Sequence, residues 1–139
     1  MGNDQRTNST AFEKFLTVLP LATYRAGETI LKAGSKTGRL LILESGAVAI
    51  LKDSIEIATV DEPGAVLGEI SALLDQPHSA DVQTLEDSQF RVADAAQIAN
   101  NPNAMLYIAK NLARRLVAAD DVLVQLRIEL HKQVALSTL

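Results

Sequence analysis

The chain has 139 residues, of which 47% are hydrophobic and 22% charged, a balance typical of one soluble globular domain. Its net charge of −4 argues against a nucleic-acid surface, because basic side chains supply most of the affinity there. The absence of cysteine excludes disulfides and cysteine-ligated zinc. No apolar run approaches the roughly 18 residues of a membrane-spanning helix. We therefore expect a cytoplasmic protein that contacts neither DNA nor a membrane.

The amino terminus predicts one short helix. We expect residues 1–10 to form a flexible polar terminus. Thr10 and Glu13 have the spacing of a capping box, in which each side chain satisfies a free backbone N–H group. The helix that follows ends at Pro20 and carries its apolar residues on one face: Phe12, Phe15, Leu16 and Leu19.

Short β-rich segments separated by glycine and aspartate turns fill the next part of the chain. Their close spacing is typical of an antiparallel sandwich or jelly roll and not of βαβ units. Asp53 and Ser54 are placed as a two-residue hairpin loop between two segments. With the flanking helices, the segments predict a mainly β fold, a β-roll or double-stranded jelly roll, over residues 11–100. The predicted strands are 29–32, 39–43, 47–52, 55–60, 82–85 and 89–92.

Two helix starts follow the predicted sheet. Asp94 and Gln97 have the spacing of a capping box. Asn101-Pro102 is a second start, with asparagine as the cap and proline at the first helical position, where its missing N–H costs nothing. Neither glycine nor proline occurs beyond that point, so we expect one long helix, assigned to residues 101–135.

The long helix carries a seam of leucines. Its apolar residues follow one another at spacings of four and three, the a/d pattern of a coiled coil. An exposed seam of this kind would promote aggregation, so we expect it to pair with a second copy of the chain. The alternative is that its first half packs on the β-domain. The predicted dimer interface consists of Leu112, Leu116, Ala119, Leu123, Leu126 and Leu130.

The sequence contains no motif of catalysis or metal binding. His78 and His131 lie far apart and there is no cysteine, so we predict no metal site. A G-x-S-x-G elbow, a Walker A loop and a G-x-G-x-x-G turn are all absent. We therefore predict a binding protein without a permanent cofactor, and not an enzyme.

Residues 68–82, GEISALLDQPHSADV, have a composition suited to a small ligand. Gly68 lets the backbone approach a ligand closely, and the helical turn at residues 70–74 begins with N–H groups that could face an anion. Glu69 can accept hydrogen bonds from a ligand hydroxyl, and Ser79 can donate one to a phosphate oxygen. Each also has an ordinary structural alternative, a helix-start acid for Glu69 and a turn serine for Ser79.

This stretch resembles the phosphate-binding cassette of cyclic nucleotide-binding domains. These are the domains of the catabolite activator (cAMP receptor) protein family, of cyclic nucleotide-dependent kinases and of gated channels. The short first helix, the β-roll and the long last helix match the architecture of that family, and the resemblance covers residues 12–130. Further features in the expected order are residues 24–28, Gly34, Leu43, Gly46, Val48 and Pro63-Gly64.

The resemblance implies a role for each residue of the cassette. Glu69 would bond the 2′-hydroxyl of the ribose, and Ser79 would contact the cyclic phosphate. His78 stands where the family has the arginine that pairs with the phosphate. Leu67 and Ile57 are weak candidates for packing on the base. The remaining contacts would come from Gly68, Ile70, Ser71 and Ala80.

The histidine weakens the expected phosphate site. Arginine is always charged and presents a planar fork to two phosphate oxygens, whereas histidine is mostly neutral at neutral pH. Loss of a charge-assisted hydrogen bond of roughly 1.5 to 3 kcal/mol would weaken binding about ten- to a hundredfold. Asp81 would repel an anion further if it points inward.

We therefore predict a regulatory module that binds cAMP or cGMP weakly or takes a different ligand. The alternative is a degenerate, ligand-free structural or protein-interaction module of the same fold. Transcription factors of the family continue past their dimer helix into a helix-turn-helix domain, whereas this sequence ends at Leu139, too soon to contain one. The expected partners are a second copy of the chain and a small nucleotide.

Overall fold

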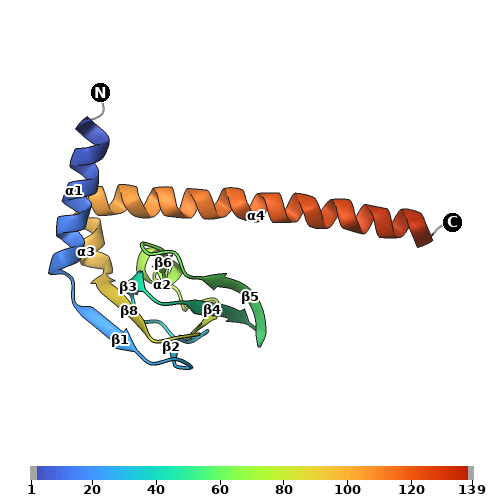
Figure 1. Cartoon of the computed structure of the whole chain (residues 1–139), viewed down its shortest axis with the longest axis horizontal. Coiled ribbons are helices and arrows are strands. Elements are labelled where there is room, and N and C mark those ends of the chain that lie inside the picture. The colour runs from blue at the N-terminus through green and yellow to red at the C-terminus, as the bar shows by residue number, and fades with distance from the viewer. Residues whose placement is uncertain (1–2, 138–139) are drawn as a thin grey trace. The chain divides into compact units, whose positions relative to one another are not determined.

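The computed structural model describes residues 3–137 of the chain. Contacts between residues divide it into two units, Met1–Leu106 and Tyr107–Leu139. The first unit contains two sheets and the helices α1 (Asn3–Val18), α2 (Glu69–Leu74) and α3 (Ala95–Ala99) (Figure 1). Helix α4 (Pro102–Ser137) begins in the first unit and forms the second.

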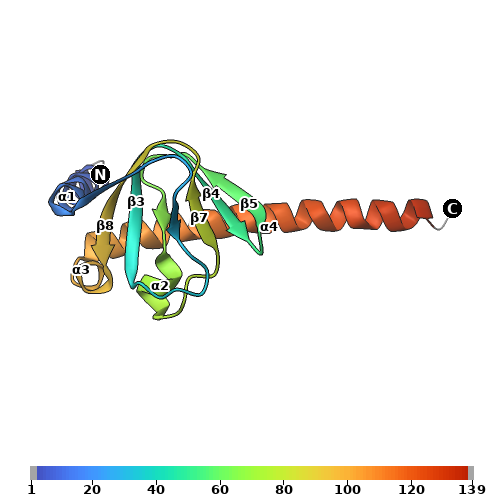
Figure 2. The ribbon, with the colours of Figure 1, turned by 90° about the horizontal axis from the view of Figure 1, so that it is seen from below.

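Two antiparallel sheets of four strands form the β-roll of the first unit (Figure 2). The strand order is β1-β8-β3-β6 in one sheet and β2-β7-β4-β5 in the other. Apart from β4 and β5, which form a hairpin within one sheet, successive strands alternate between the sheets, as in a jelly roll, and this confirms the predicted fold class. The strands are β1 (Leu21–Tyr24), β2 (Thr29–Leu31), β3 (Arg39–Ser45), β4 (Val48–Lys52), β5 (Ile55–Val60), β6 (Val66–Leu67), β7 (Asp81–Thr84) and β8 (Ser88–Asp94).

The core of the β-roll is aliphatic with one aromatic ring at its centre. Phe90 on β8 is fully buried and meets the ring of Tyr24 edge-on, with centroids 5.9 Å apart. Alternate residues of each strand face the space between the sheets, so β3 contributes Leu41 and Leu43. The other members of this cluster are Leu31, Val48, Leu67, Val82 and Phe90.

The predicted hairpin joins β4 and β5. Its two loop residues, Asp53 (φ 52°) and Ser54 (φ 66°), both adopt the left-handed conformation. Two such residues make the type I′ turn, whose twist matches that of paired strands. The turn forms here without the glycine that most often adopts these positive φ angles.

Helix α1 begins earlier than the sequence predicted. It starts at Asn3, so Thr10 lies inside the helix and the predicted capping box at Thr10 is wrong. The polar residues before Thr10 include neither glycine nor proline after Gly2, so nothing in them stops a helix from extending toward the terminus. The predicted apolar face is confirmed at Phe12 and Leu19, which are buried.

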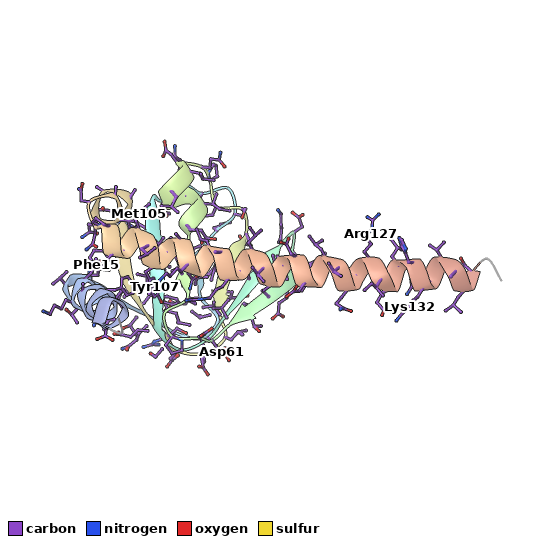
Figure 3. All side chains as sticks on the ribbon, turned by 90° about the horizontal axis from the view of Figure 1, so that it is seen from above. Phe15, Asp61, Met105, Tyr107, Arg127 and Lys132 are labelled. Carbon is purple, nitrogen blue, oxygen red and sulfur yellow. The ribbon has the colours of Figure 1, made fainter. Side chains whose placement is uncertain are left out.

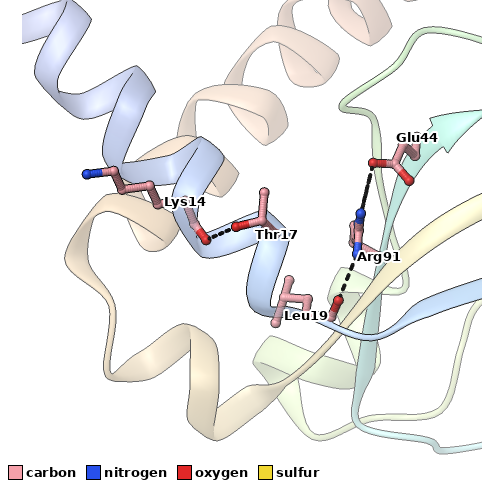
Figure 4. Close-up of polar contacts among 5 residues, drawn as sticks. All are labelled: Lys14, Thr17, Leu19, Glu44 and Arg91. Carbon is pink, nitrogen blue, oxygen red and sulfur yellow. Dashed lines mark hydrogen bonds and ion pairs between the residues drawn. The ribbon is translucent and has the colours of Figure 1, made fainter.

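Arg91 fastens the end of α1 to the sheet (Figure 4). Its Nη1 donates to the carbonyl oxygen of Leu19 at 3.0 Å, and its Nη2 lies 3.3 Å from Oε1 of Glu44 on β3. One side chain of β8 therefore joins the residue after α1 to a neighbouring strand. Within the last turns of α1, the hydroxyl of Thr17 donates to the carbonyl oxygen of Lys14 at 2.7 Å.

Both helix starts predicted after the sheet are confirmed. Asp94 accepts a hydrogen bond from the N–H of Gln97 at 2.8 Å, and the Gln97 side chain accepts one from the N–H of Asp94 at 3.0 Å. Asn101 accepts from the N–H of Ala104 at 3.1 Å, directly before α4. Asparagine and aspartate fit these places because each oxygen satisfies a backbone donor of the first turn.

Helix α4 exposes the predicted leucine seam along the second unit. Four of its leucines are 59–64% exposed: Leu116, Leu123, Leu126 and Leu130. Arg127 and Lys132 project from the same part of the helix (Figure 3). Among residues 3–137, no helix combines the length and apolar character that a bilayer crossing requires.

Candidate functional site

The cassette connects β6 to β7 through the short helix α2. Gly68 precedes α2 in the left-handed conformation (φ 82°), which side-chain-bearing residues rarely adopt. A Cβ atom on Gly68 would lie 2.7 Å from the carbonyl oxygen of Arg39 and 3.5 Å from Cε1 of His78. Position 68 therefore requires glycine for both conformation and space, and the cassette packs tightly against the start of β3.

Ser71 holds the loop between β2 and β3. Its side chain is 1% exposed, and its hydroxyl oxygen accepts from the N–H groups of Thr37 at 3.1 Å and Gly38 at 2.9 Å. A buried oxygen that accepts two backbone hydrogen bonds is part of the framework. The predicted role of Ser71 as a ligand contact stays a prediction.

His78 is buried, with only 5% of its surface exposed. Its ring nitrogen Nε2 lies 2.8 Å from the hydroxyl of Thr37. Its backbone N–H donates to the carbonyl oxygen of Ser35 at 2.8 Å, and its carbonyl oxygen accepts from the N–H of Gly34 at 2.9 Å. Both the ring and the backbone of His78 are therefore bonded to the β2–β3 loop.

Burial and the carboxylate of Glu69 shift the pKa of the His78 imidazole in opposite directions. Burial lowers the pKa of His78 below its ordinary value of 6.5, and the negative charge of Glu69 opposes this in part. The net shift is downward, so the ring is neutral at neutral pH. The structure thus brings Glu69 and His78 together, as the sequence predicted, but in a form without positive charge at position 78.

Two further contacts complete the attachment of the β2–β3 loop to the cassette. Asp81 accepts from the N–H of Ala33 at 2.7 Å, so its carboxylate holds the loop. Lys36 forms an ion pair with Asp75 at 3.0 Å. Sequence reasoning missed these partners, because nothing in the spacing of loop residues 33–38 indicates which cassette residues they meet.

The other predicted residues differ in exposure. Ser79 is exposed, while Ile70 and Ala80 are partly buried. Leu67 belongs to the buried core cluster, and Ile57 is exposed on β5. Ser79 therefore presents a hydroxyl at the surface of the cassette, as a ligand contact requires.

The chemistry available in the cassette is that of hydrogen bonding. Within residues 3–137, no group of three or more histidine, cysteine, aspartate or glutamate side chains is arranged to hold a metal ion. The cassette offers a carboxylate at Glu69, an imidazole at His78 and a hydroxyl at Ser79. These groups suit recognition of a polar small molecule.

A family model described as the cyclic nucleotide-binding domain matches residues 21–100, which include both sheets and the cassette. Among solved structures, the catabolite activator protein of Thermus thermophilus is 27% identical, with a TM-score of 0.69. The match covers 83% of this chain and 58% of that one.

Two other relatives place a similar region inside longer chains. The regulatory subunit of a cAMP-independent protein kinase A from Trypanosoma cruzi, bound to guanosine, is 26% identical with a TM-score of 0.55. That match covers 59% of this chain and 29% of that one. Glutaminase 2 of Bradyrhizobium diazoefficiens is 35% identical over 108 residues, which are 70% of this chain and 17% of the glutaminase.

Proposed function

Because the chain belongs to the cyclic nucleotide-binding domain family, we propose that it is a regulatory ligand-binding module and not an enzyme. Its cassette takes a ribose-bearing ligand of the cyclic nucleotide class, such as cAMP or cGMP, at a weakened phosphate site. The module pairs through α4. Its lack of cysteine fits the reducing conditions of the cytoplasm.

The observation that carries the proposal is the state of His78. In the family an arginine at this position pairs with the phosphate, whereas the imidazole here is buried and bonded to Thr37. A neutral ring cannot supply the charge-assisted hydrogen bonds that make arginine effective, each worth roughly 1.5 to 3 kcal/mol. Binding of the phosphate is therefore weakened, while recognition of the ribose is left to other groups.

Glu69 and Ser79 are the groups we assign to the ligand. Glu69 follows Gly68, whose left-handed conformation directs the chain into α2. Ser79 is exposed directly after His78. The kinase regulatory subunit bound to guanosine supports the view that this fold accepts a ribose without a phosphate.

The exposed seam of α4 supports pairing with a second copy. In heptad notation Leu116 and Leu123 occupy a positions, and Arg115 and Asp120 occupy g and e positions. In a parallel dimer, a g residue faces the e residue five positions later in the partner, so Arg115 would meet Asp120 of opposite charge. The charge pattern thus favours a parallel pair in register.

The ligand site is tested by isothermal titration calorimetry with cAMP and cGMP on the wild type and Glu69→Gln. We expect weak binding by the wild type and about tenfold weaker binding by the variant, because a hydrogen bond to a charged acceptor is lost. Glu62→Gln removes the same charge from an exposed turn and serves as the control, with unchanged affinity.

A second candidate is a ligand-free structural module, and the bonds of the β2–β3 loop favour it. Ser71, His78 and Asp81 all have partners within the chain that hold the loop on the cassette. A cassette closed in this way keeps its shape without a ligand. Absence of heat with every ribose-bearing compound, also after His78→Arg, would contradict binding and favour this second function.

A further inference from the structure

Strand β5 forms one edge of the sheet β2-β7-β4-β5 (Figure 2). It pairs with β4, and the described part of the chain contains no backbone hydrogen bond from residues 55–60 to any other segment. Alternate residues of such an edge direct their N–H and C=O groups away from the sheet. The outer side of β5 is therefore a row of backbone donors and acceptors that another strand can satisfy.

This edge is long and apolar compared with the other edges of the two sheets. β5 has six residues, whereas the edge strands β1, β2 and β6 have four, three and two. Ile55 is 65% exposed and Ile57 is 58% exposed, and Ile57 has no residue opposite it on β4 because the register shifts there. Proteins usually protect an exposed edge by keeping it short or by placing proline or lysine on it, and residues 55–60 contain neither. An edge of this kind favours the addition of a strand.

Acidic side chains surround the same edge. Asp53 lies in the turn before β5, Glu56 lies in the strand, and Asp61 and Glu62 follow it, all four being exposed. Among the described residues, none of these four carboxylates has an ion-pair partner. With Lys52 as its single cation, the segment from the end of β4 to Glu62 has a net charge of −3. The edge therefore attracts positively charged groups.

We infer that β5 is a docking site for an extended, basic segment of a partner protein, which adds to the sheet as a fifth strand. Charge decides between this partner and a second copy of β5. Two copies paired edge to edge would bring together two segments of charge −3, whereas lysine or arginine side chains of a basic strand would lie opposite the carboxylates. The bulge at Ile57 also favours a flexible peptide, because a peptide follows the increased twist of a bulged strand more easily than a rigid sheet does. β4 lies between β5 and β7, the strand to which the cassette leads, so docking at β5 does not require a ligand in the cassette.

Synthetic peptides of about eight residues test the docking site on the wild-type chain. The first alternates lysine with valine, the second alternates glutamate with valine, and the third is the lysine peptide with its backbone nitrogens methylated. The third peptide keeps the charge but lacks the N–H donors of a strand, so it separates strand addition from general attraction between charges. We expect the first peptide to bind about tenfold or more tightly than the other two in fluorescence anisotropy. It should also slow the hydrogen exchange of amides in residues 55–60, because their outward N–H groups become bonded.

A charge reversal at the middle of the edge tests the role of the carboxylates. Glu56→Lys should weaken binding of the lysine peptide about three- to tenfold, because an attraction is replaced by a repulsion. Glu86→Lys makes the same change at an exposed position between β7 and β8 and should leave the affinity within about twofold of the wild type. Both side chains are exposed, so neither substitution disturbs the core.

Several results would overturn docking at β5. One is equal binding of the lysine peptide and its methylated form, and another is unchanged exchange of residues 55–60 when the lysine peptide is bound. Equal loss of affinity in Glu56→Lys and Glu86→Lys, or no binding of any peptide at millimolar concentration, would contradict it as well. Exchange of the β5 amides that slows with rising concentration of the chain alone would show that a second copy occupies the edge, and a partner strand would then be excluded.

Discussion

His78 joins two segments that lie far apart in the sequence. Its ring and backbone bond to the loop between β2 and β3, and its neighbour Glu69 lies at the start of α2. The ring is therefore part of the framework, and in the proposed function it also borders the ligand site. A substitution at this position should therefore change the stability of the fold as well as the proposed binding.

The lowered pKa of His78 predicts a loss of stability in mild acid. Below pH 6.5 the unfolded chain takes up a proton at this residue more readily than the folded chain does. The free energy of unfolding therefore decreases as the pH is lowered. The fall begins near 6.5 and ends at the lower pKa of the folded state. Denaturant unfolding of the wild type and of His78→Gln, repeated at several pH values from neutral to mildly acidic, measures this decrease in the free energy of unfolding.

His131→Gln is the matched control for this experiment, because His131 is exposed on α4. We expect the difference in unfolding free energy between neutral pH and mild acid to shrink in His78→Gln and to persist in His131→Gln. The same acid dependence in His78→Gln as in the wild type would show that other groups cause it.

At the scale of elements, the hydrogen bonds that hold the β2–β3 loop on the cassette give a further prediction. Ser71→Ala removes the acceptor of two backbone N–H groups, those of Thr37 and Gly38, whose hydrogen bonds to Ser71 are partly buried. We expect a loss of about 1 to 3 kcal/mol in the free energy of unfolding. Ser79→Ala makes the same chemical change at an exposed site and should cost less than about 0.5 kcal/mol. Equal effects of the two variants would contradict the role of Ser71.

The sequence predicted the elements with strong local signals. Alternating β-rich segments and turns identified six strands, and capping residues located the starts of α3 and α4. The strands β1 and β6 were missed because β1 is short and adjoins Pro20, while β6 has only two residues. The start of α1 was misplaced because a polar segment without glycine or proline is compatible with either a helix or a coil.

The candidate site was predicted only in part, because some of its contacts join residues that are far apart in the sequence. The motif identified Gly68, Glu69 and His78 as neighbours in one cassette. The partner of the imidazole, Thr37, is 41 residues away, and no local pattern links the two. The sequence predicted a mostly neutral imidazole, whereas the lowering of its pKa follows from burial in that long-range packing and required the structure.

At the scale of the whole molecule, the same module occurs within chains of different size. This chain spans 58% of the catabolite activator, 29% of the kinase regulatory subunit and 17% of the glutaminase. Among the residues whose exposure the structure describes, exposed large apolar side chains are concentrated on α4, which makes pairing the first property to test.

Pairing through the seam predicts that Leu123→Glu separates the two copies. Leu123 is 63% exposed in the single chain and occupies the middle of the seam, so a dimer would bury a carboxylate without a partner there. Sedimentation velocity should show a dimer for the wild type and a monomer for the variant, with an increase in the dissociation constant of about a hundredfold or more, from the cost of an uncompensated buried charge.

Gln125→Glu adds the same charge to the opposite face of α4 and should remain dimeric. A monomeric wild type, or dissociation of both variants alike, would show that the seam does not hold two copies together. Unchanged melting of the β-roll in Leu123→Glu would further show that the substitution acts on association and not on folding.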